Sequence, residues 1–439
     1  MRRARAVVCL VSTTLAACTA RQATRPTRGP AIPPAAAPAA AGPARYLYVW
    51  AGDKDEKDSD FLAVVDVRPA SATYGQVLAT APVGMRGTMA HHLEYALPPA
   101  GQLLYANGHH HEAIFQFDVS DAERPRLVGT ASPAPPLRYP HDFVRLPNQN
   151  LLVGYLRSEG PSPVPGDSTM PGNSGGVAEL TPDGRVVRWG SAADSSLPWP
   201  MRPYAFAVLP ERDRFVVTSA AMMEPSSANA VQVWRLSDLR RLHTLPVPPA
   251  RLPDGRMLDS GHAVPFEPRV MRDGSVLLNA FGCGFYRVTG IDTDRPAIQN
   301  VYTLDVPAGR VPPGRLAGCG VPVVDGRFWV MAVGRLNLLL TLDVSDPARP
   351  REVARLQTDS SFRPHWLAKD PGSDRIVVGA ENGGEDRMLM ARLDARTGAL
   401  RWDETFRSAD GRLGVSFVRE RWPHGATGEA FGHAALFRP

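Results

Sequence analysis

The folded part of the sequence lacks an excess of either charge. The chain has 49 basic and 44 acidic residues, but six of its arginines and none of its acids lie within residues 1–44. The remaining residues therefore carry 43 basic against 44 acidic side chains. A surface that binds nucleic acid needs clustered basic charge. The composition consequently excludes nucleic acid as an expected partner.

The N-terminal segment lacks an apolar run long enough to form a membrane-spanning helix. It starts with MRRAR, continues with a short apolar run and reaches Leu-Ala-Ala-Cys at residues 15–18. This order is typical of a secretory signal, and Leu-Ala-Ala-Cys resembles the lipobox of bacterial lipoproteins. We expect residues 1–17 to be a lipoprotein signal peptide and Cys18 to carry the lipid. The alternative is an ordinary secretory signal in which Cys18 is incidental.

Residues 18–44 lack a pattern that could form a packed core. The segment is rich in Ala, Pro and Thr, as in RPTRGPAIPPAAAPAAAGPA, and is expected to be a semi-extended tether. Together with a lipid at Cys18, the tether would hold a folded domain, residues 45–439, away from a membrane surface. We therefore expect an exported protein that is anchored at the bacterial cell envelope and faces the periplasm or the cell surface.

The folded domain also lacks long amphipathic helices, and it contains a repeat instead. Two segments are plainly alike, AIFQFDVSDAERPRLVG from Ala113 and LLLTLDVSDPARPREVA from Leu338. Five further segments share the alternating pattern: FLAVVDV, GVAELTP, VQVWRLS, GFYRVTG and LMARLDA. The last apolar positions of the seven segments are separated by 52, 63, 56, 52, 54 and 51 residues. Such regular spacing indicates a repeat architecture.

Each repeat contains an earlier pair of strands, so that one unit is four-stranded and antiparallel. Second strands such as LLYANG, VLLNAF and FWVMAV follow turns that contain Pro, Asp or Gly. Seven such units predict an all-β fold, a seven-bladed β-propeller. The first unit lacks a first strand of its own. The C-terminal GHAALFRP is expected to supply it by pairing with the N-terminal YLYVWAG. Two packed β-sandwiches are the alternative, and the even spacing argues against them.

The first strand of each propeller blade lines the central channel, and the residues at the heads of these strands are rich in histidine. Histidine makes up 11 of 439 residues, yet four of the seven heads are histidines. Imidazole suits copper, zinc, iron and nickel, which predicts a metal site at one mouth of the channel. His91 is expected in the loop above His92. The seven heads are His92, His141, Tyr204, Glu267, Cys319, His365 and His433.

Further histidines are expected on or near the same face. The run His109, His110 and His111 follows a second strand, His262 lies in a loop that leads to a channel strand, and His424 lies near the closing strand. Any one of these side chains is more simply a hydrogen-bonded structural residue. The convergence of several histidines at one mouth favours a functional site.

Cysteine is scarce, and only two cysteines belong to the folded domain. Cys283 in FGCGFY and Cys319 in AGCGVP are both flanked by glycines and are expected at the same mouth, in adjacent blades. In an oxidising compartment a structural disulfide is the leading interpretation. A redox-active or metal-binding pair is the alternative.

The order of several motifs resembles the selenium-binding protein family, which includes copper-dependent methanethiol oxidases. The motifs are YLYVWAG, DFLAVVDVRPASATYGQVL, AHHLEY, FQFDVSDAERPRLV, YPHDFVRLPNQNLLVGYL and GHAALFRP. The resemblance implies a copper site and the oxidation of a small thiol, such as methanethiol, by O₂ to formaldehyde, sulfide and peroxide. It assigns the metal to His91, His92, His141 and His433, with His365 matched by blade position alone. Tyr204 and Glu267 are then candidate proton carriers.

The sequence departs from this family directly after the paired histidines. Relatives have a cysteine-bearing stretch there that is linked to selenium binding, whereas this chain has EYALPPAGQL, which argues against selenium. The repeated DVSD-x-x-RP motif also resembles bacterial surface proteins without known catalysis. A non-catalytic binding, scaffold or metal-carrier propeller is therefore the alternative function. A propeller hydrolase or lactonase with another metal is a third hypothesis, because one fold hosts many chemistries.

Overall fold

The computed structural model describes residues 42–131, 134–160, 173–222, 226–252, 254–258, 264–307, 309–312, 315–381 and 386–439. The predicted signal peptide, Cys18, most of the predicted tether and His262 lie outside these residues. Within the described ranges, no helix is both long and apolar enough to cross a membrane.

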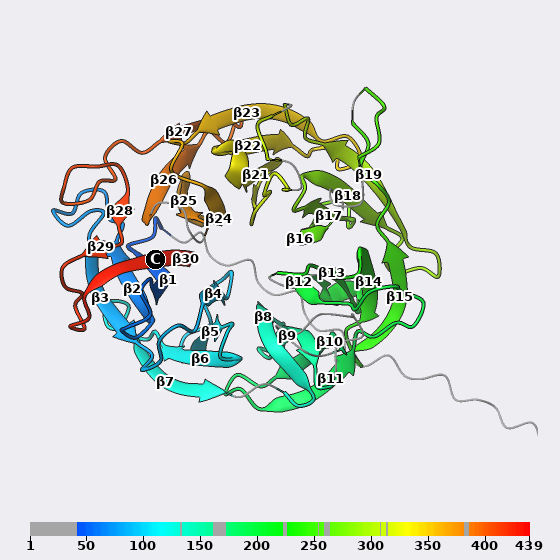
Figure 1. Cartoon of the computed structure of the whole chain (residues 1–439), viewed down its shortest axis with the longest axis horizontal. Helices are drawn as coiled ribbons and strands as arrows, with labels where there is room; N and C mark the ends of the chain where they lie inside the picture. Colours follow the sequence, from blue (N-terminus) through cyan, green and yellow to red (C-terminus); the bar gives the residue numbers. More distant parts are fainter. Residues whose placement is uncertain are drawn as a thin grey trace, which may run out of the picture. The chain divides into compact units, whose positions relative to one another are not determined.

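The described strands form seven antiparallel sheets arranged around a ring (Figure 1), which confirms the seven-bladed β-propeller. We number the blades along the chain, and each is given from its inner to its outer strand. Blade 1 is β30 (Gly428–Arg438), β1 (Tyr46–Asp53), β2 (Phe61–Asp66) and β3 (Val77–Pro82), with β29 (Val418–Arg419) beside β30; blade 2 is β4 (Ala90–Leu93), β5 (Leu103–Gly108), β6 (Ala113–Asp118) and β7 (Arg126–Ala131); blade 3 is β8 (Leu137–Arg145), β9 (Leu151–Ser158), β10 (Asn173–Leu180) and β11 (Val186–Ser191).

The remaining four blades repeat this order. Blade 4 is β12 (Pro203–Leu209), β13 (Arg214–Ser219), β14 (Ala230–Arg235) and β15 (Arg240–Pro246); blade 5 is β16 (Pro265–Val270), β17 (Val276–Ala280), β18 (Gly284–Thr289) and β19 (Ala297–Thr303); blade 6 is β20 (Val323–Asp325), β21 (Phe328–Val333), β22 (Leu338–Asp343) and β23 (Arg351–Gln357); blade 7 is β24 (Pro364–Lys369), β25 (Arg375–Ala380), β26 (Arg387–Leu393) and β27 (Leu400–Trp402), with β28 (Val415–Ser416) on β26. Short 3₁₀ turns occur at Pro210–Arg212 and Gly334–Leu336.

The burial of each strand follows from its place in the blade. Middle strands such as β2, FLAVVD, and β21, FWVMAV, are buried along their whole length because neighbouring blades cover both faces. The outer strand β7 alternates between exposed and half-buried residues, and every residue of β23 is exposed or half-buried. The hydrophobic core therefore lies between the blades, and the inner strands are left to line the channel.

The aspartates that end several third strands explain the repeated Asp-Val-Ser-Asp signature. The Oδ1 atoms of Asp118 and Asp343 accept hydrogen bonds from the backbone N–H groups two residues later, each at 2.9 Å. Asp66 and Asp394 make the same bond at 2.9 Å. A carboxylate at this place builds the turn that leads to the outer strand, which is why the motif recurs at the blade spacing.

The ring closes by pairing of the two terminal strands, as the sequence predicted. β30 runs antiparallel to β1 from Tyr46↔Arg438 to Asp53↔Ala430, with a bulge at Trp50/Ala51. Closure removes two free strand edges. The ring also includes Ala44, which is buried and donates its backbone N–H to the Asp370 carboxylate.

Candidate metal centre

The two neighbouring histidines of blade 2 lie in the same short strand, β4. The prediction that His91 lies in the loop above His92 is therefore wrong. Ala90 pairs with Gly108 and Leu93 pairs with Ala106, so that β4 has one residue more than its partner over this stretch. Such a bulge lets adjacent side chains depart from strict alternation. As a result both rings enter one cluster, with their centroids 4.6 Å apart.

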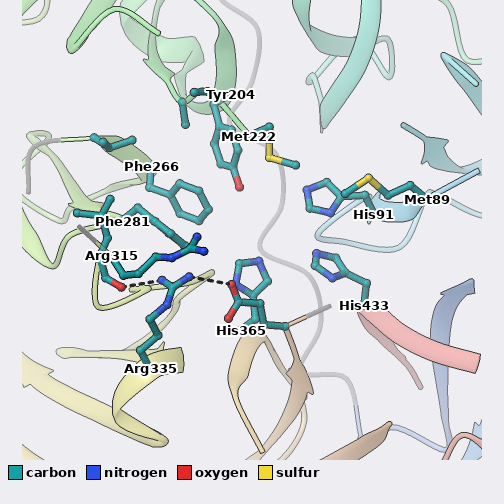
Figure 2. A pocket seen from close by; sticks show the side chains of 15 residues that line it. Met89, His91, Tyr204, Met222, Phe266, Phe281, Arg315, Arg335, His365 and His433 are labelled. Atoms are coloured by element: carbon teal, nitrogen blue, oxygen red, sulfur yellow. Dashed lines mark hydrogen bonds and ion pairs between the residues drawn. The ribbon is translucent and has the colours of Figure 1, made fainter. Parts of the chain in front are cut away.

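Histidines from three further blades approach this pair. The ring of His141 in β8 lies 4.2 Å from that of His92 and 5.1 Å from that of His91. The ring of His433 in β30 lies 4.3 Å from that of His91 and 5.0 Å from that of His365 in β24. Figure 2 shows His91, His365 and His433 around one end of the channel. The structure thus brings together all five predicted metal ligands.

Three of these histidines have the geometry of a chelating set. One ligand nitrogen each from His91, His92 and His141 lies within 4.8 Å of the other two. The Nδ1 atom of His141 lies 2.7 Å from the Tyr204 carbonyl oxygen, to which it donates. This bond fixes the tautomer and leaves the Nε2 lone pair for another partner.

Five of the six ring nitrogens of this set lack a hydrogen-bond partner among the described residues. Within the described ranges, both ring nitrogens of His91 and His92 and the Nε2 atom of His141 are buried without a hydrogen bond. Buried polar atoms are seldom left unpaired without a function. Burial, and to a smaller extent the charges of neighbouring histidines, lowers the pKa of all three side chains. The pKa of His91 and of His92 lies well below the usual range, and that of His141 is lowered to about 3. Neutral imidazoles with free lone pairs fit copper and other transition metals.

Asn107 in β5 orients two of these histidines, and the sequence analysis missed it. Its Oδ1 atom accepts a hydrogen bond of 2.7 Å from the His92 backbone N–H, and its Nδ2 atom donates to the Pro140 carbonyl at 2.8 Å. Asn279 in blade 5 occupies a similar place and donates to the Cys319 carbonyl at 3.0 Å. The signal was available, because the second strands LLYANG and VLLNAF both carry Asn near their ends.

Tyr204 stands beside the cluster as predicted, whereas Glu267 does not. The ring of Tyr204 lies 4.1 Å from that of His141, and its hydroxyl is buried without a partner among the described residues. Burial raises the pKa of Tyr204 well above its usual value. The carboxylate of Glu267 accepts from Arg269 at 2.9 Å and from the Tyr95 hydroxyl at 3.2 Å. The Glu267 side chain therefore points away from the mouth of the channel at which it was predicted.

The remaining candidate histidines separate into one that joins the cluster and three that do not. His109 is buried, lies 6.2 Å from His91 between ring centroids, and has a pKa lowered to about 3, mainly by burial. His110 and His111 are exposed. His424 packs 4.8 Å from Phe61 between ring centroids, and its Nδ1 atom lies 2.7 Å from the Thr80 hydroxyl, on the outer part of blade 1.

Cys283 and Cys319 form a disulfide that joins blades 5 and 6, with their Cα atoms 5.3 Å apart. Both residues are fully buried. Cys319 precedes the inner strand, since β20 begins at Val323, and it forms only an isolated bridge with Val333. Of the two interpretations left open by the sequence, the structure therefore shows the disulfide.

A pocket of about 430 Å³ opens beside the cluster, and we call it the histidine pocket. Its histidines are His91, His365 and His433, and an apolar wall faces them (Figure 2). Arg315, Arg335 and Glu381 complete the lining, the apolar wall includes Met222, Val264, Phe266, Phe281 and Leu316, and Met89 lies beside His91.

A second pocket of about 440 Å³ is lined by residues further along the same inner strands, and we call it the distal pocket. β24 contributes His365 to the histidine pocket and Trp366 to the distal one, and β4 is followed by Tyr95 in the distal pocket. Trp366 stacks on Tyr95 at 5.4 Å and meets the edge of His92 at 5.0 Å, between ring centroids. The two pockets thus lie toward opposite ends of the channel, with aromatic rings between them.

Comparisons with known proteins agree with this fold. No family model matches the chain. A methanethiol oxidase from Hyphomicrobium is 36% identical over 118 residues, 25% of this chain and 26% of the relative. One from Ruegeria pomeroyi is 34% identical over 122 residues, 26% of this chain and 27% of the relative. The chain thus spans about a quarter of the length of the curated relatives that it matches. The structure of a hypothetical selenium-binding protein from Sulfolobus tokodaii has a TM-score of 0.68 at 15% identity and covers 90% of this chain and 94% of that one.

Proposed function

We propose that this chain, a distant member of the selenium-binding protein and methanethiol oxidase family, is an exported, copper-dependent oxidase of small thiols. The observation that carries the proposal is the set of three buried, neutral imidazoles with ligand nitrogens within 4.8 Å of one another. His91, His92 and His141 would hold the metal, and His433 and His365 would border it on the side of the histidine pocket. The names of the two partial relatives support a thiol as the substrate class.

The proposed reaction converts methanethiol, O₂ and water into formaldehyde, hydrogen sulfide and hydrogen peroxide. The C–S bond and one C–H bond of the thiol break, carbon loses two electrons, and O₂ gains two electrons and two protons. Copper, when bound, would supply a redox-active centre that exchanges electrons with both substrates. The protein would position the thiol, exclude bulk water with the apolar wall and manage the protons.

Tyr204 is the candidate proton carrier at this site. Its phenol is buried 4.1 Å from the His141 ring, between centroids, and its raised pKa keeps the proton on the oxygen at neutral pH. A protonated phenol without a protein acceptor can donate a hydrogen bond to a negatively charged sulfur or oxygen atom in the pocket. Glu267 is not assigned this role, because its carboxylate is bonded to Arg269 and Tyr95.

The first experiment measures metal content and turnover together. We expect the full-length protein, loaded with copper and checked by elemental analysis, to consume O₂ and to release peroxide when methanethiol is added. The His92→Ala/His141→Ala variant should bind little copper and show no turnover. Equal copper in both proteins would refute the site, and a fully loaded but inactive wild type would refute the oxidase.

A metal carrier is the second candidate, and the composition of the cluster favours it. The chelating set contains imidazoles alone, which suit several transition metals and which supply no catalytic acid or base beyond the metal. A carrier would bind copper as tightly as the oxidase would. The two functions separate in the same experiment, since a carrier shows metal occupancy without thiol-dependent O₂ uptake.

Export and lipid anchoring belong to the proposal as well. The Cys283–Cys319 disulfide supports export, because such bonds persist in oxidising compartments. We expect the protein to fractionate with membranes, and we expect Cys18→Ser to release it in soluble form. Wild type that remains soluble, without incorporated lipid label, would contradict the anchor.

A further inference from the structure

The histidine pocket is larger than methanethiol requires. Its volume of about 430 Å³ falls in the range of roughly 300–1,000 Å³ that is typical of pockets for larger organic ligands. Methanethiol has only two non-hydrogen atoms. The pocket therefore has room for a thiol with a longer chain and a second functional group.

The chemistry of the lining differs from one side to the other. Figure 2 shows His91 and His433 on one side of the pocket and Arg315 and Arg335 extending toward its middle from the other side, with His365 between them. Met222 and the two rings of Phe266 and Phe281 also line the pocket. A ligand that spans this space would meet imidazoles at one end, apolar side chains along its length and guanidinium groups at the other end.

The fixed charges of the described lining favour an anion. Two guanidinium groups and one carboxylate, that of Glu381, line the pocket, which leaves an excess of one positive charge.

The two arginines are incompletely paired. Arg335 donates to the Leu316 carbonyl at 2.6 Å, and its contact with Glu381 is long, at 4.0 Å. The exposed Arg315 side chain has no hydrogen-bond or ion-pair partner among the described residues. The planar fork of a guanidinium matches the two oxygens of a carboxylate.

We infer that the histidine pocket binds a thiol that also bears a carboxylate. The carboxylate contacts Arg315 and Arg335, the methylene chain lies against Phe266 and Phe281, and the sulfur lies beside the histidines. This inference rests on the proposed thiol oxidation and names its substrate class. The reaction has the same stoichiometry as the oxidation of methanethiol. A mercaptocarboxylate, O₂ and water give an aldehyde carboxylate, hydrogen sulfide and hydrogen peroxide, and two electrons pass from carbon to oxygen.

The kinetic test compares 3-mercaptopropionate with propanethiol, which has the same number of carbons and no charge. For the copper-loaded, full-length protein we expect kcat/KM to be at least about tenfold higher for the acid, as a charge-assisted hydrogen bond would give. Arg315→Gln should reduce this ratio about tenfold. Arg310→Gln, which removes the same charge from an exposed residue outside the pocket lining, should leave the ratio unchanged. Equal kcat/KM for both thiols would overturn the inference.

A binding measurement keeps the inference testable if no thiol is oxidised. Metal-free, full-length protein is titrated with 3-mercaptopropionate and with propanethiol in a calorimeter without oxygen. We expect tighter binding of the acid and a loss of about tenfold in Arg315→Gln. Arg335→Lys, which keeps the charge but not the fork, should lose part of that preference. Binding without turnover would refute the oxidase and retain the anion site, whereas turnover without a preference for the acid would do the reverse.

Discussion

The two pockets of the channel have similar volumes and opposite states of pairing. In the distal pocket, Arg145 donates twice to Glu94, at 2.7 and 3.0 Å, and Arg269 donates to Glu267 at 2.9 Å. In the histidine pocket, both ring nitrogens of His91 are buried without a hydrogen bond to any described residue. The Arg145–Glu94 pair joins blades 3 and 2, whereas buried nitrogens without a hydrogen bond are seldom left unpaired without a function. The two pockets therefore differ in the pairing of their polar groups and not in their volume.

The largest expected effect is the dependence of the free energy of unfolding on pH. Its sign for the buried histidines is opposite to its sign for Glu94. Unfolded histidine has a pKa of about 6.5, whereas burial lowers the pKa of His109 and of His141 to about 3. The unfolded state therefore binds more protons below pH 6.5, so the free energy of unfolding falls as pH falls. We expect metal-free protein to lose more than about 3 kcal/mol between pH 7 and pH 5, measured by urea unfolding.

Glu94 in the distal pocket should act in the opposite direction. Burial raises its pKa to about 7, so the folded state holds a proton that the unfolded state has released above about pH 4.5. Its stabilising contribution is complete in acid and is lost as pH rises toward 7. Glu94→Gln should remove this decline and leave the acid-side loss in place. A stability curve that is flat from pH 7 to pH 5 would contradict the account of the histidines.

The next largest effect is expected from Arg145→Ala. This change leaves the buried Glu94 carboxylate without its bidentate partner, which should cost about 3 kcal/mol of unfolding free energy at pH 8. Copper affinity, measured by competition with a chelator, should stay within about twofold because the histidines keep their own contacts. A large loss of copper affinity would show that the two ends are coupled.

The reverse pattern is expected from His92→Ala. Removal of one chelating ring should weaken copper binding by about 100-fold or more. Stability of the metal-free protein should change by less than about 2 kcal/mol, because no hydrogen bond of the imidazole is lost. Unfolding in urea provides the control. A severe loss of stability with unchanged copper affinity would make His92 a structural residue.

A smaller effect should distinguish two similar asparagines. Asn107→Ala removes the bonds to His92 and Pro140 and should weaken copper binding about tenfold. Asn279→Ala removes a comparable bond to the Cys319 carbonyl and should reduce stability by about 1–2 kcal/mol without affecting copper. Equal effects of the two variants on copper affinity would refute the positioning role of Asn107.

The repeat spacing predicted the architecture well because each blade solves the same packing problem. Third strands and their Asp turns recur at a near-constant interval, and counting back from the second strands placed His92, His141, His365 and His433 on inner strands. For Cys283 and Cys319 the sequence favoured a disulfide but left a redox-active or metal-binding pair open, since the choice depends on the distance between two loops of different blades.

The errors came from side-chain direction within single strands. The bulge in β4 is a property of its pairing with β5, and no local pattern in the sequence revealed that His91 would lie inside the strand. Glu267 was assigned to the histidine end because it heads an inner strand, yet its neighbour Phe266 faces that end instead. Spacing determines which strand a residue belongs to, and the register of hydrogen bonds determines where its side chain points.

The closing strand β30 has a consequence for the order in which the molecule is made. β30 is synthesised after every other strand of the ring, and it brings His433 to within 4.3 Å of His91, between ring centroids, as it pairs with β1. A chain interrupted before residue 428 would lack the strand that closes the ring and would lack His433 in the histidine cluster. Loss of β30 would leave β1 with a free strand edge and would open the histidine cluster beside His91.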